Sequence, residues 1–273
     1  MLTLMYITNI PEVALIAEKH EVDRVWVDLE ALGKEDRQKN IDSVKSHHSI
    51  EDVRVLSSLL KTSQLLVRVN PWNADSVQEI EAVIENGADA VMLPMWRTVD
   101  EVKAFVRAIN GRAKTILLLE TCEAEACLDD VLLCPGIDEI HVGLNDLHLS
   151  YKMKFMFELL SNGTVDRICS KIEQAGLPYG FGGVAALGNG NLPAEYVIKE
   201  HYRIGSTRAI LSRGFCNIDA YESMEDFDIA FGNNMKDLRL FEEEVMGLTD
   251  AEFEANRAKV LDIVEKVVKE TTL

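Results

Sequence analysis

Cysteine pairs with the spacing of a zinc site or a disulfide framework are absent from this sequence. The five cysteines are an odd number, none belongs to a C-x-x-C pair, and no paired-histidine motif accompanies them. We therefore expect buried, inert thiols. Cys122 and Cys127 lie just beyond Glu120, so a reactive thiol there is the alternative. The cysteines are Cys122, Cys127, Cys134, Cys169 and Cys216.

Long apolar runs and positive charge are also scarce. No stretch reaches the roughly 18 apolar residues of a transmembrane helix, and the N-terminal MLTLMYITNI lacks a basic segment before its apolar part. The chain has 28 Lys and Arg against 46 Asp and Glu, a formal net charge of −18. This argues against nucleic acid or an anionic membrane as the main partner. We expect a cytoplasmic protein in which only local basic residues can hold an anionic substrate.

Glycine-rich nucleotide motifs are missing as well. No G-x-G-x-x-G follows the first apolar run, and no G-x-x-x-x-G-K-[ST] occurs anywhere in the chain. These glycines would allow the backbone to approach a phosphate closely, so the sequence gives no support to a nucleotide-binding fold.

What the sequence does contain is a regular alternation of apolar, β-rich runs with stretches of helical spacing. Two of the helical stretches, residues 76–87 and 99–111, end on Gly, the usual residue just past a helix. Continuous apolar strands that alternate with helices indicate a parallel sheet, and eight repeats favour a closed (β/α)8 barrel over an open sheet. The runs span residues 4–8, 24–30, 64–70, 90–95, 115–120, 139–146, 179–185 and 208–213.

The residues after the eighth run predict a helical extension. We divide the chain into a catalytic barrel over residues 1–218 and an extension over residues 219–273. Val260, Ile263, Val264, Val267 and Val268 fall on one apolar stripe at helical spacing. This stripe must be buried, either on the barrel of its own chain or on a neighbouring subunit.

Two of the expected strands end on a carboxylate, Glu120 and Asp146. In a (β/α)8 barrel the active site lies at the carboxyl ends of the strands, so such charges are candidates for the catalytic face. Mg²⁺ typically takes one or two protein carboxylates and completes its shell with water and substrate. The alternative is that both are ordinary strand-end charges, one of them paired with Arg68. The same rule predicts that six further residues lie at the catalytic face: Asp28, Glu30, Arg68, Asn70, Asn145 and Arg213.

Five segments resemble the HpcH/HpaI aldolase family, which is related to the citrate lyase β subunit. The resemblance runs from about residue 20 to residue 215, and it implies a phosphoenolpyruvate/pyruvate-binding barrel with class II pyruvate aldolase chemistry. Members of this family tend to form multimers through helices near the C-terminus, so we expect a homo-oligomer. The segments are VWVDLE, LLVRVN, ADAVMLPM, LLLET and PGIDEIHVGLNDLHLS.

The resemblance also implies roles for individual residues. Glu120 and Asp146 match the family's metal ligands, with Mg²⁺ as the first expectation and Mn²⁺ or Co²⁺ as alternatives. Arg68 matches the arginine that binds the pyruvate carbonyl oxygen and steadies the enolate. Glu30 matches the acid that orders a water near the metal. The loop that contains Asp146, together with Gly143 and Asn145, would contribute to substrate binding.

One departure concerns the proton. The family usually has a general-base His directly after the strand-two Glu, and this chain has Ala31 there. The loop over residues 31–49 carries His47 and His48, and an unperturbed pKa near 6.5 suits a base. Arg37, with Lys34 beside it, could bind an anionic group of the second substrate. The alternative is that these side chains are ordinary surface charges.

Together these patterns predict a metal-dependent lyase that acts on a 2-oxo acid through its enolate, with an aldehyde, for example a sugar-derived one, as second substrate. A citrate-lyase-like cleavage of an acyl thioester is the first alternative. The second is a catalytically degenerate barrel that binds a small acid or a partner protein, an alternative that Ala31 favours.

Overall fold

The computed structural model describes residues 1–32 and 48–271, and its eight strands form a closed barrel in the order β1 to β8. The strand pairs β2–β3, β3–β4, β4–β5 and β7–β8 are parallel. The (β/α)8 fold predicted from the sequence is therefore confirmed. The strands are β1 (Thr3–Ile7), β2 (Arg24–Asp28), β3 (Gln64–Arg68), β4 (Ala90–Leu93), β5 (Lys114–Leu119), β6 (Glu139–Val142), β7 (Tyr179–Val184) and β8 (Arg208–Leu211).

The chain divides into two compact units. One comprises Tyr6–Ile140, and the other combines Met1–Met5 with His141–Leu273. The sequence predicts a different division, into a barrel over residues 1–218 and a helical extension over residues 219–273. The two compact units do not test that division, which stays a prediction.

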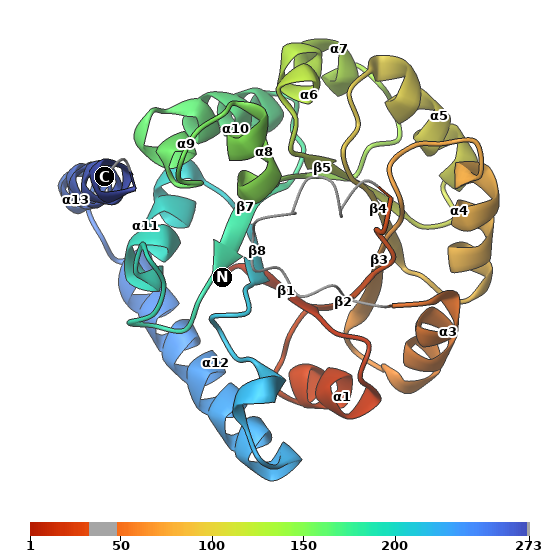
Figure 1. Ribbon diagram of the computed structural model, residues 1–273, viewed down its shortest axis with the longest axis horizontal. Coiled ribbons are helices and arrows are strands. Elements are labelled where there is room, and N and C mark those ends of the chain that lie inside the picture. The colour runs from red at the N-terminus through yellow and green to blue at the C-terminus, as the bar shows by residue number, and fades with distance from the viewer. Residues whose placement is uncertain (33–47, 272–273) are drawn as a thin grey trace. The chain divides into compact units, whose positions relative to one another are not determined.

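Within Tyr6–Ile140 the helices lie outside the strands that they connect (Figure 1). Ser49 caps α3, because its side chain accepts the N–H of Asp52 in a capping box. On α5 the buried residues Val102, Phe105 and Ile109 follow helical spacing, so this helix places one face on the strands. The helices are α1 (Pro11–Lys19), α3 (Ile50–Leu59), α4 (Ser76–Glu85), α5 (Val99–Ile109), α6 (Cys122–Ala126) and α7 (Leu128–Leu132).

A buried ion pair joins the first residues of two strands in the same unit. Arg24 of β2 donates to both carboxylate oxygens of Glu139 of β6, at 2.7 and 2.9 Å. Both side chains are almost fully buried, so the two charges neutralise each other away from water.

In the other unit the C-terminal helix α13 (Asp250–Glu270) packs against α11 (Ala194–Ile204) and α9 (Glu158–Ser161) of its own chain (Figure 1). Val260 and Val264 are buried there. Of the two destinations expected for the apolar stripe, these valines use the chain itself, while the predicted homo-oligomer stays a prediction. The remaining helices are α8 (Leu144–Ser150), α10 (Thr164–Gln174), the 3-10 turn η1 (Ile218–Ala220) and α12 (Met224–Met246).

The long helix α12 holds the first residues of the chain. Glu242 is fully buried, and its Oε1 accepts the backbone N–H of Leu2 at 2.7 Å and the hydroxyl of Tyr202 at 2.9 Å. Arg239 donates to the other oxygen of Glu242 at 2.7 Å and to the carbonyl of Leu2 at 2.9 Å. One carboxylate on α12 therefore fixes the start of the strand that opens the barrel.

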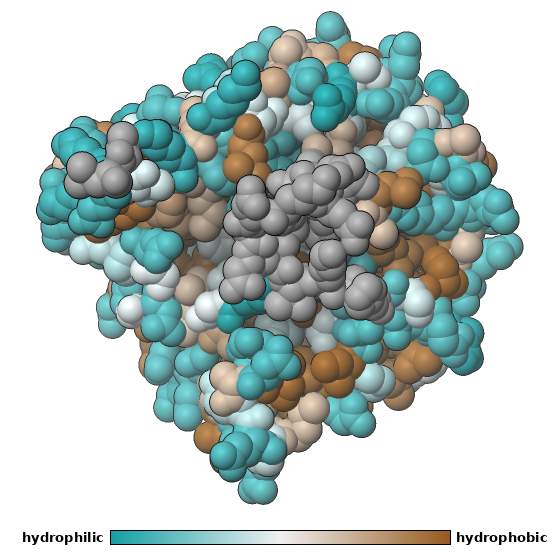
Figure 2. Space-filling model, in the orientation of Figure 1, coloured by the Kyte–Doolittle hydropathy of each residue, from teal (hydrophilic) through white to brown (hydrophobic). Residues whose placement is uncertain are grey.

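Hydrophilic residues cover most of the face shown in Figure 2, as the large excess of acidic side chains leads one to expect. Among residues 1–32 and 48–271, no helix combines the length and the apolar character needed to cross a membrane. The cytoplasmic location stays a prediction.

Candidate active site

The best-defined polar cluster lies at the carboxyl ends of β2 and β3, where Asp28 and Arg68 are register partners. Arg68 donates to both oxygens of Asp28, from Nε and from Nη2, each at 2.8 Å. Nη2 also lies 3.2 Å from an oxygen of Glu30. The guanidinium of Arg68 sits over the ring of Trp26 at 5.1 Å. The side chain of Arg68 is thus held in one orientation on several sides.

Charge keeps this arginine protonated. Burial lowers the pKa of Arg68, but the carboxylates of Asp28, Glu30 and Glu120 raise it by more, so it lies above its ordinary value. The sequence alternative in which Glu120 or Asp146 is the ion-pair partner differs from the observed contacts, which pair Arg68 with Asp28 and Glu30. Three carboxylates act on one guanidinium, so these four groups carry a formal net charge of −2.

Glu120 follows β5 directly and is almost fully buried. Its Oε1 accepts the backbone N–H of Met95 at 3.0 Å. Met95 has a φ of 54°, in the left-handed region that side chains with a Cβ rarely adopt. The strained backbone after β4 thus directs an N–H at the carboxylate expected to bind the metal.

His48, one of the two expected histidines, lies at the end of β2. Its Nδ1 accepts the backbone N–H of Asp28 at 2.8 Å. Because Nδ1 is an acceptor in this bond, a neutral His48 carries its hydrogen on Nε2. The ring can therefore give a hydrogen bond from Nε2 more readily than it can take a proton at Nδ1.

Asn70, two residues after β3, holds the backbone that follows Glu30. Its Oδ1 accepts the N–H groups of Ala31 and Leu32 at 2.9 and 3.0 Å. Its Nδ2 donates to Oε1 of Glu79, in the first turn of α4, at 2.7 Å. The expected strand-end residue Asn70 is thus linked to a carboxylate that the strand-end rule did not collect.

Gly143, Asn145 and Asp146 belong to the other unit. Gly143 is the N-cap of α8, and Asp146 is an acidic residue in the first turn of that helix. Asn145 is exposed, whereas Gly143 and Asp146 are partly buried. Their predicted roles in substrate and metal binding stay predictions.

Other expected residues fall outside this cluster or outside the structure. His47, Arg37 and Lys34 lie outside the described residues. Arg213, after β8, has an exposed side chain. His141 of β6 is fully buried, contacts the carbonyl of Gly182 through Nε2 at 3.1 Å, and belongs to the other unit.

Three contributors to the cluster had no role in the sequence prediction. Asp28 was collected as a strand-end residue without a function, although its place opposite Arg68 on a parallel neighbour could have suggested an ion pair. Glu79 carries a weak signal, an acidic residue in the first turn of a helix. Met95 carries none, because a left-handed backbone at a methionine leaves no trace in the sequence.

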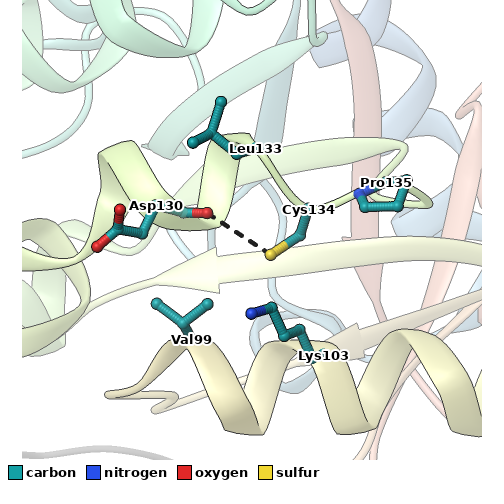
Figure 3. A pocket seen from close by; sticks show the side chains of 6 residues that line it. All are labelled: Val99, Lys103, Asp130, Leu133, Cys134 and Pro135. Atoms are coloured by element: carbon teal, nitrogen blue, oxygen red, sulfur yellow. Dashed lines mark hydrogen bonds between the residues drawn. The ribbon is translucent and has the colours of Figure 1, made fainter.

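A shallow depression of about 430 Å³ lies away from these strand ends, between α5 and the residues around α7 (Figure 3). In it the thiol of Cys134 donates to the carbonyl of Asp130 at 3.6 Å. Its lining contains no residue that the sequence assigns to catalysis or metal binding. The lining residues are Val99, Lys103, Asp130, Leu133, Cys134 and Pro135.

The chemistry of the strand ends around Arg68 suits a hard divalent cation. Within residues 1–32 and 48–271, no group of three or more His, Cys, Asp or Glu side chains is arranged around a common metal position. A site for Mg²⁺ needs only one or two protein carboxylates, because water and substrate supply the other ligands. The buried carboxylate of Glu120, and the formal net negative charge around Arg68, fit such a cation, while Asp146 as the second ligand stays a prediction.

Comparison with known proteins agrees with this architecture. Residues 3–175 match the family model for HpcH/HpaI aldolase/citrate lyase. An HpcH/HpaI aldolase from Desulfitobacterium hafniense DCB-2 superposes with a TM-score of 0.62 at 13% identity, covering 77% of this chain and 86% of that chain. A family protein from Burkholderia cenocepacia J2315 gives 0.60 at 15% identity, covering 77% and 88%.

A third solved structure is the citrate lyase beta subunit from M. tuberculosis, complexed with oxaloacetate and magnesium. Its TM-score is 0.55 at 16% identity, covering 84% of this chain and 96% of that chain. Identities this low show a shared fold only. No curated protein matches the sequence. The family model, by contrast, matches more than half of the chain in sequence, so the chain belongs to the HpcH/HpaI aldolase/citrate lyase family.

Proposed function

We propose that this protein is a metal-dependent carbon–carbon lyase that forms the enolate of a 2-oxo acid, pyruvate in the simplest case, and joins it to or releases it from an aldehyde. Family membership supports the reaction class. The single observation that carries the finer proposal is the buried guanidinium of Arg68, fixed among Asp28, Glu30 and Glu120 at the strand ends.

Glu120 and Asp146 would hold the divalent ion, with Mg²⁺ first and Mn²⁺ or Co²⁺ as alternatives. A bound ion of this kind supplies Lewis-acid polarisation of the keto oxygen. The N–H of Met95 orients Glu120, because it occupies Oε1 of that carboxylate. In this proposal Glu30, beside Arg68, orders a water near the ion.

Arg68 would stabilise the enolate oxygen. Its Nε and Nη2 are engaged by Asp28 and Glu30, while Nη1 makes no hydrogen bond within the part of the chain that the structure describes. A permanently charged donor that is already oriented loses little freedom when the oxyanion develops, and one such donor is typically worth roughly 3 kcal/mol. Arg68 therefore has both the charge and the unused N–H that the role requires.

The proton needs a different solution from the family's usual histidine. Ala31 has no side chain that can titrate, and Nδ1 of His48 is occupied by the backbone of Asp28. In this proposal His48, at the end of β2, and His47, which lies outside the described residues, are the candidates for proton transfer. Gly143 and Asn145 would contribute to substrate binding.

The proposal is tested by hydrogen–deuterium exchange at the methyl group of pyruvate, followed by NMR in D₂O with Mg²⁺, Mn²⁺ or Co²⁺ added. This measurement detects the enolate without knowledge of the aldehyde. We expect metal-dependent exchange that Glu120→Gln and Arg68→Ala abolish. Glu81 and Arg112 form a surface pair of the same residue types at 2.7 Å, so Glu81→Gln and Arg112→Ala are matched controls that retain exchange.

Carbon–carbon cleavage of an acyl thioester is a second candidate, because Ala31 replaces the family's usual base and Nδ1 of His48 is engaged by the backbone, while His47 lies outside the described residues. A citrate-lyase-like enzyme would cleave the carbon–carbon bond of a citrate-type CoA thioester to give an acyl-CoA and a 2-oxo acid, with the thioester kept. This cleavage without pyruvate exchange would favour the second candidate. Metal and pyruvate binding with neither activity would favour a degenerate barrel.

A further inference from the structure

The turn after β2 is fixed by hydrogen bonds on both sides of the peptide that joins Glu30 to Ala31. The N–H of Glu30 donates to Oδ1 of Asp28 at 3.2 Å. The next two N–H groups, of Ala31 and Leu32, both donate to Oδ1 of Asn70. The backbone after Glu30, which helps to place the carboxylate beside Arg68, is thus held at two successive N–H groups by a single amide oxygen.

The orientation of the Asn70 amide is in turn set by Glu79. A carboxylate only accepts hydrogen bonds, and a backbone N–H only donates them. With Glu79 ionised, only the observed orientation satisfies both neighbours, because Nδ2 must face Glu79 and Oδ1 must face Ala31 and Leu32. The carboxylate of Glu79 also accepts the backbone N–H of Asn70, at 3.2 and 3.3 Å.

We infer that Glu79 is a positioning residue of this site, whose carboxylate sets the side-chain amide of Asn70 so that Asn70 holds residues 31 and 32 and keeps Glu30 beside Arg68. The catalytic consequence of this inference rests on the proposed function. The hydrogen bonds that link Glu79, Asn70 and residues 31 and 32 do not depend on it. Burial raises the pKa of Glu79, and the hydrogen bonds from Asn70 lower it by less. The chain of bonds therefore weakens at acid pH, when Glu79 takes a proton and can donate to Oδ1 in competition with the backbone.

Three variants separate positioning from a general structural role. Asn70→Asp keeps the acceptor for Ala31 and Leu32 but places a second carboxylate oxygen at the 2.7 Å contact with Glu79. Glu79→Gln alone keeps one acceptor oxygen but adds an NH2 group that can donate to Oδ1 of Asn70, so it is expected to raise exchange of Ala31 and Leu32, although less than Asn70→Asp does. The double variant Asn70→Asp/Glu79→Gln restores a donor between the two side chains and has the same formal charge as the natural chain.

The readout that does not depend on activity is amide exchange of Ala31 and Leu32, measured by mass spectrometry on metal-free protein. We expect Asn70→Asp to raise exchange of these two amides roughly tenfold and the double variant to return it to within about threefold of the natural protein. Lowering the pH restores protection in Asn70→Asp, because one shared proton replaces the lost amide donor. Protection unchanged in Asn70→Asp, or no recovery in the double variant, overturns the inference.

The turnover number for pyruvate exchange is expected to follow the same order, lost in Asn70→Asp and recovered in the double variant. Recovery of amide protection in a protein that never exchanges pyruvate would leave the positioning chain intact and refute the proposed function instead. If Asn70→Asp does not fold, Glu79→Ala decides, because exchange at Ala31 and Leu32 must then rise although Asn70 is present. Glu81→Gln, on the same helix, is the control.

Discussion

Asp28 binds Arg68 through both carboxylate oxygens while its own backbone N–H binds His48, so one residue at the end of β2 orients two side chains of the candidate site. The two hydrogen bonds to Arg68 are parallel and involve opposite charges, the strongest common geometry for this pair. Side-chain and backbone changes at position 28 therefore have separable effects, since only the carboxylate reaches the arginine.

Asp28→Asn is expected to lower the pyruvate exchange rate at saturating pyruvate roughly a hundredfold, because a misplaced guanidinium no longer meets the developing oxyanion. The amide nitrogen of Asn would face an arginine donor. Metal affinity should change little, since Glu120 is untouched. Asp138→Asn is the control, because Asp138 also accepts a buried backbone N–H, from Thr115, but at the opposite end of β5. If Asp28→Asn exchanged pyruvate as fast as the natural protein, the exchange would not depend on the pairing of Asp28 with Arg68.

Glu139→Gln is expected to destabilise the fold by roughly 3–5 kcal/mol, because it removes the buried carboxylate that neutralises the buried charge of Arg24. The free energy of unfolding from urea titration measures this loss. The double variant Arg24→Met/Glu139→Leu removes both charges and should recover most of the stability. A small loss in the single variant would mean that water reaches Arg24.

Met95→Gly should retain metal binding, whereas Met95→Val should weaken it and cost roughly 1–2 kcal/mol of stability, because a β-branched residue resists the left-handed backbone. Mn²⁺ titration followed by electron paramagnetic resonance gives the affinity. Asn110→Val is the matched control, since Asn110 has a φ of 50° at the end of α5. It should lose stability without a change in metal affinity. Equal Mn²⁺ affinities in the two Met95 variants would contradict the prediction. They would show that the left-handed backbone at residue 95 does not determine the orientation of Glu120.

Stability should fall as the pH drops from about 6.5, because burial, together with the neighbouring His141, lowers the pKa of His201 to about 3. The ring of His201 stacks on Phe181 at 3.9 Å, and its Nδ1 lies 2.8 Å from Oγ of Ser206. Its folded pKa is below the unfolded value, so the unfolded chain takes up a proton that the folded chain refuses. The resulting loss is at most about 1.4 kcal/mol per pH unit.

Urea unfolding at several pH values between about 7 and 5, above the range in which most carboxylates titrate, tests this dependence. His201→Gln, which cannot titrate, should show a shallower slope than the natural protein. Parallel slopes would assign the effect to other groups.

The positions of the strands could be predicted well from the sequence, because each buried strand is a continuous apolar run. Their carboxyl ends were placed too late. The expected strand over residues 24–30 ends at Asp28, and that over residues 139–146 ends at Val142. The excess residues are the polar ones that leave the barrel to form the site, such as Glu30. Periodicity marks burial, and it cannot show where the backbone stops pairing.

The partners within the site could be predicted only in part. The strand-end rule identified Asp28, Glu30, Arg68 and Glu120, since it depends only on strand order. It did not by itself pair Arg68 with Asp28, because the pairing also requires the register between β2 and β3, which a rule based on strand order leaves open. The link from Asn70 to Glu79 depends on how the loop between β3 and α4 places the first turn of α4, and helical periodicity does not show that placement. The sequence thus predicts which residues lie at the strand ends, but it does not predict which of them form hydrogen bonds with each other.

The bond between Glu242 and Leu2 also links two segments that are far apart in the sequence. Residues 1–5 belong to the same compact unit as residues 141–273, and Glu242 on α12 fixes them. A contact over such a sequence separation forms only after a large loop has closed, so residues 1–5 are expected to join their unit late in folding. A chain cut before α12 would lose this bond and expose residues 1–5 to amide exchange and proteolysis.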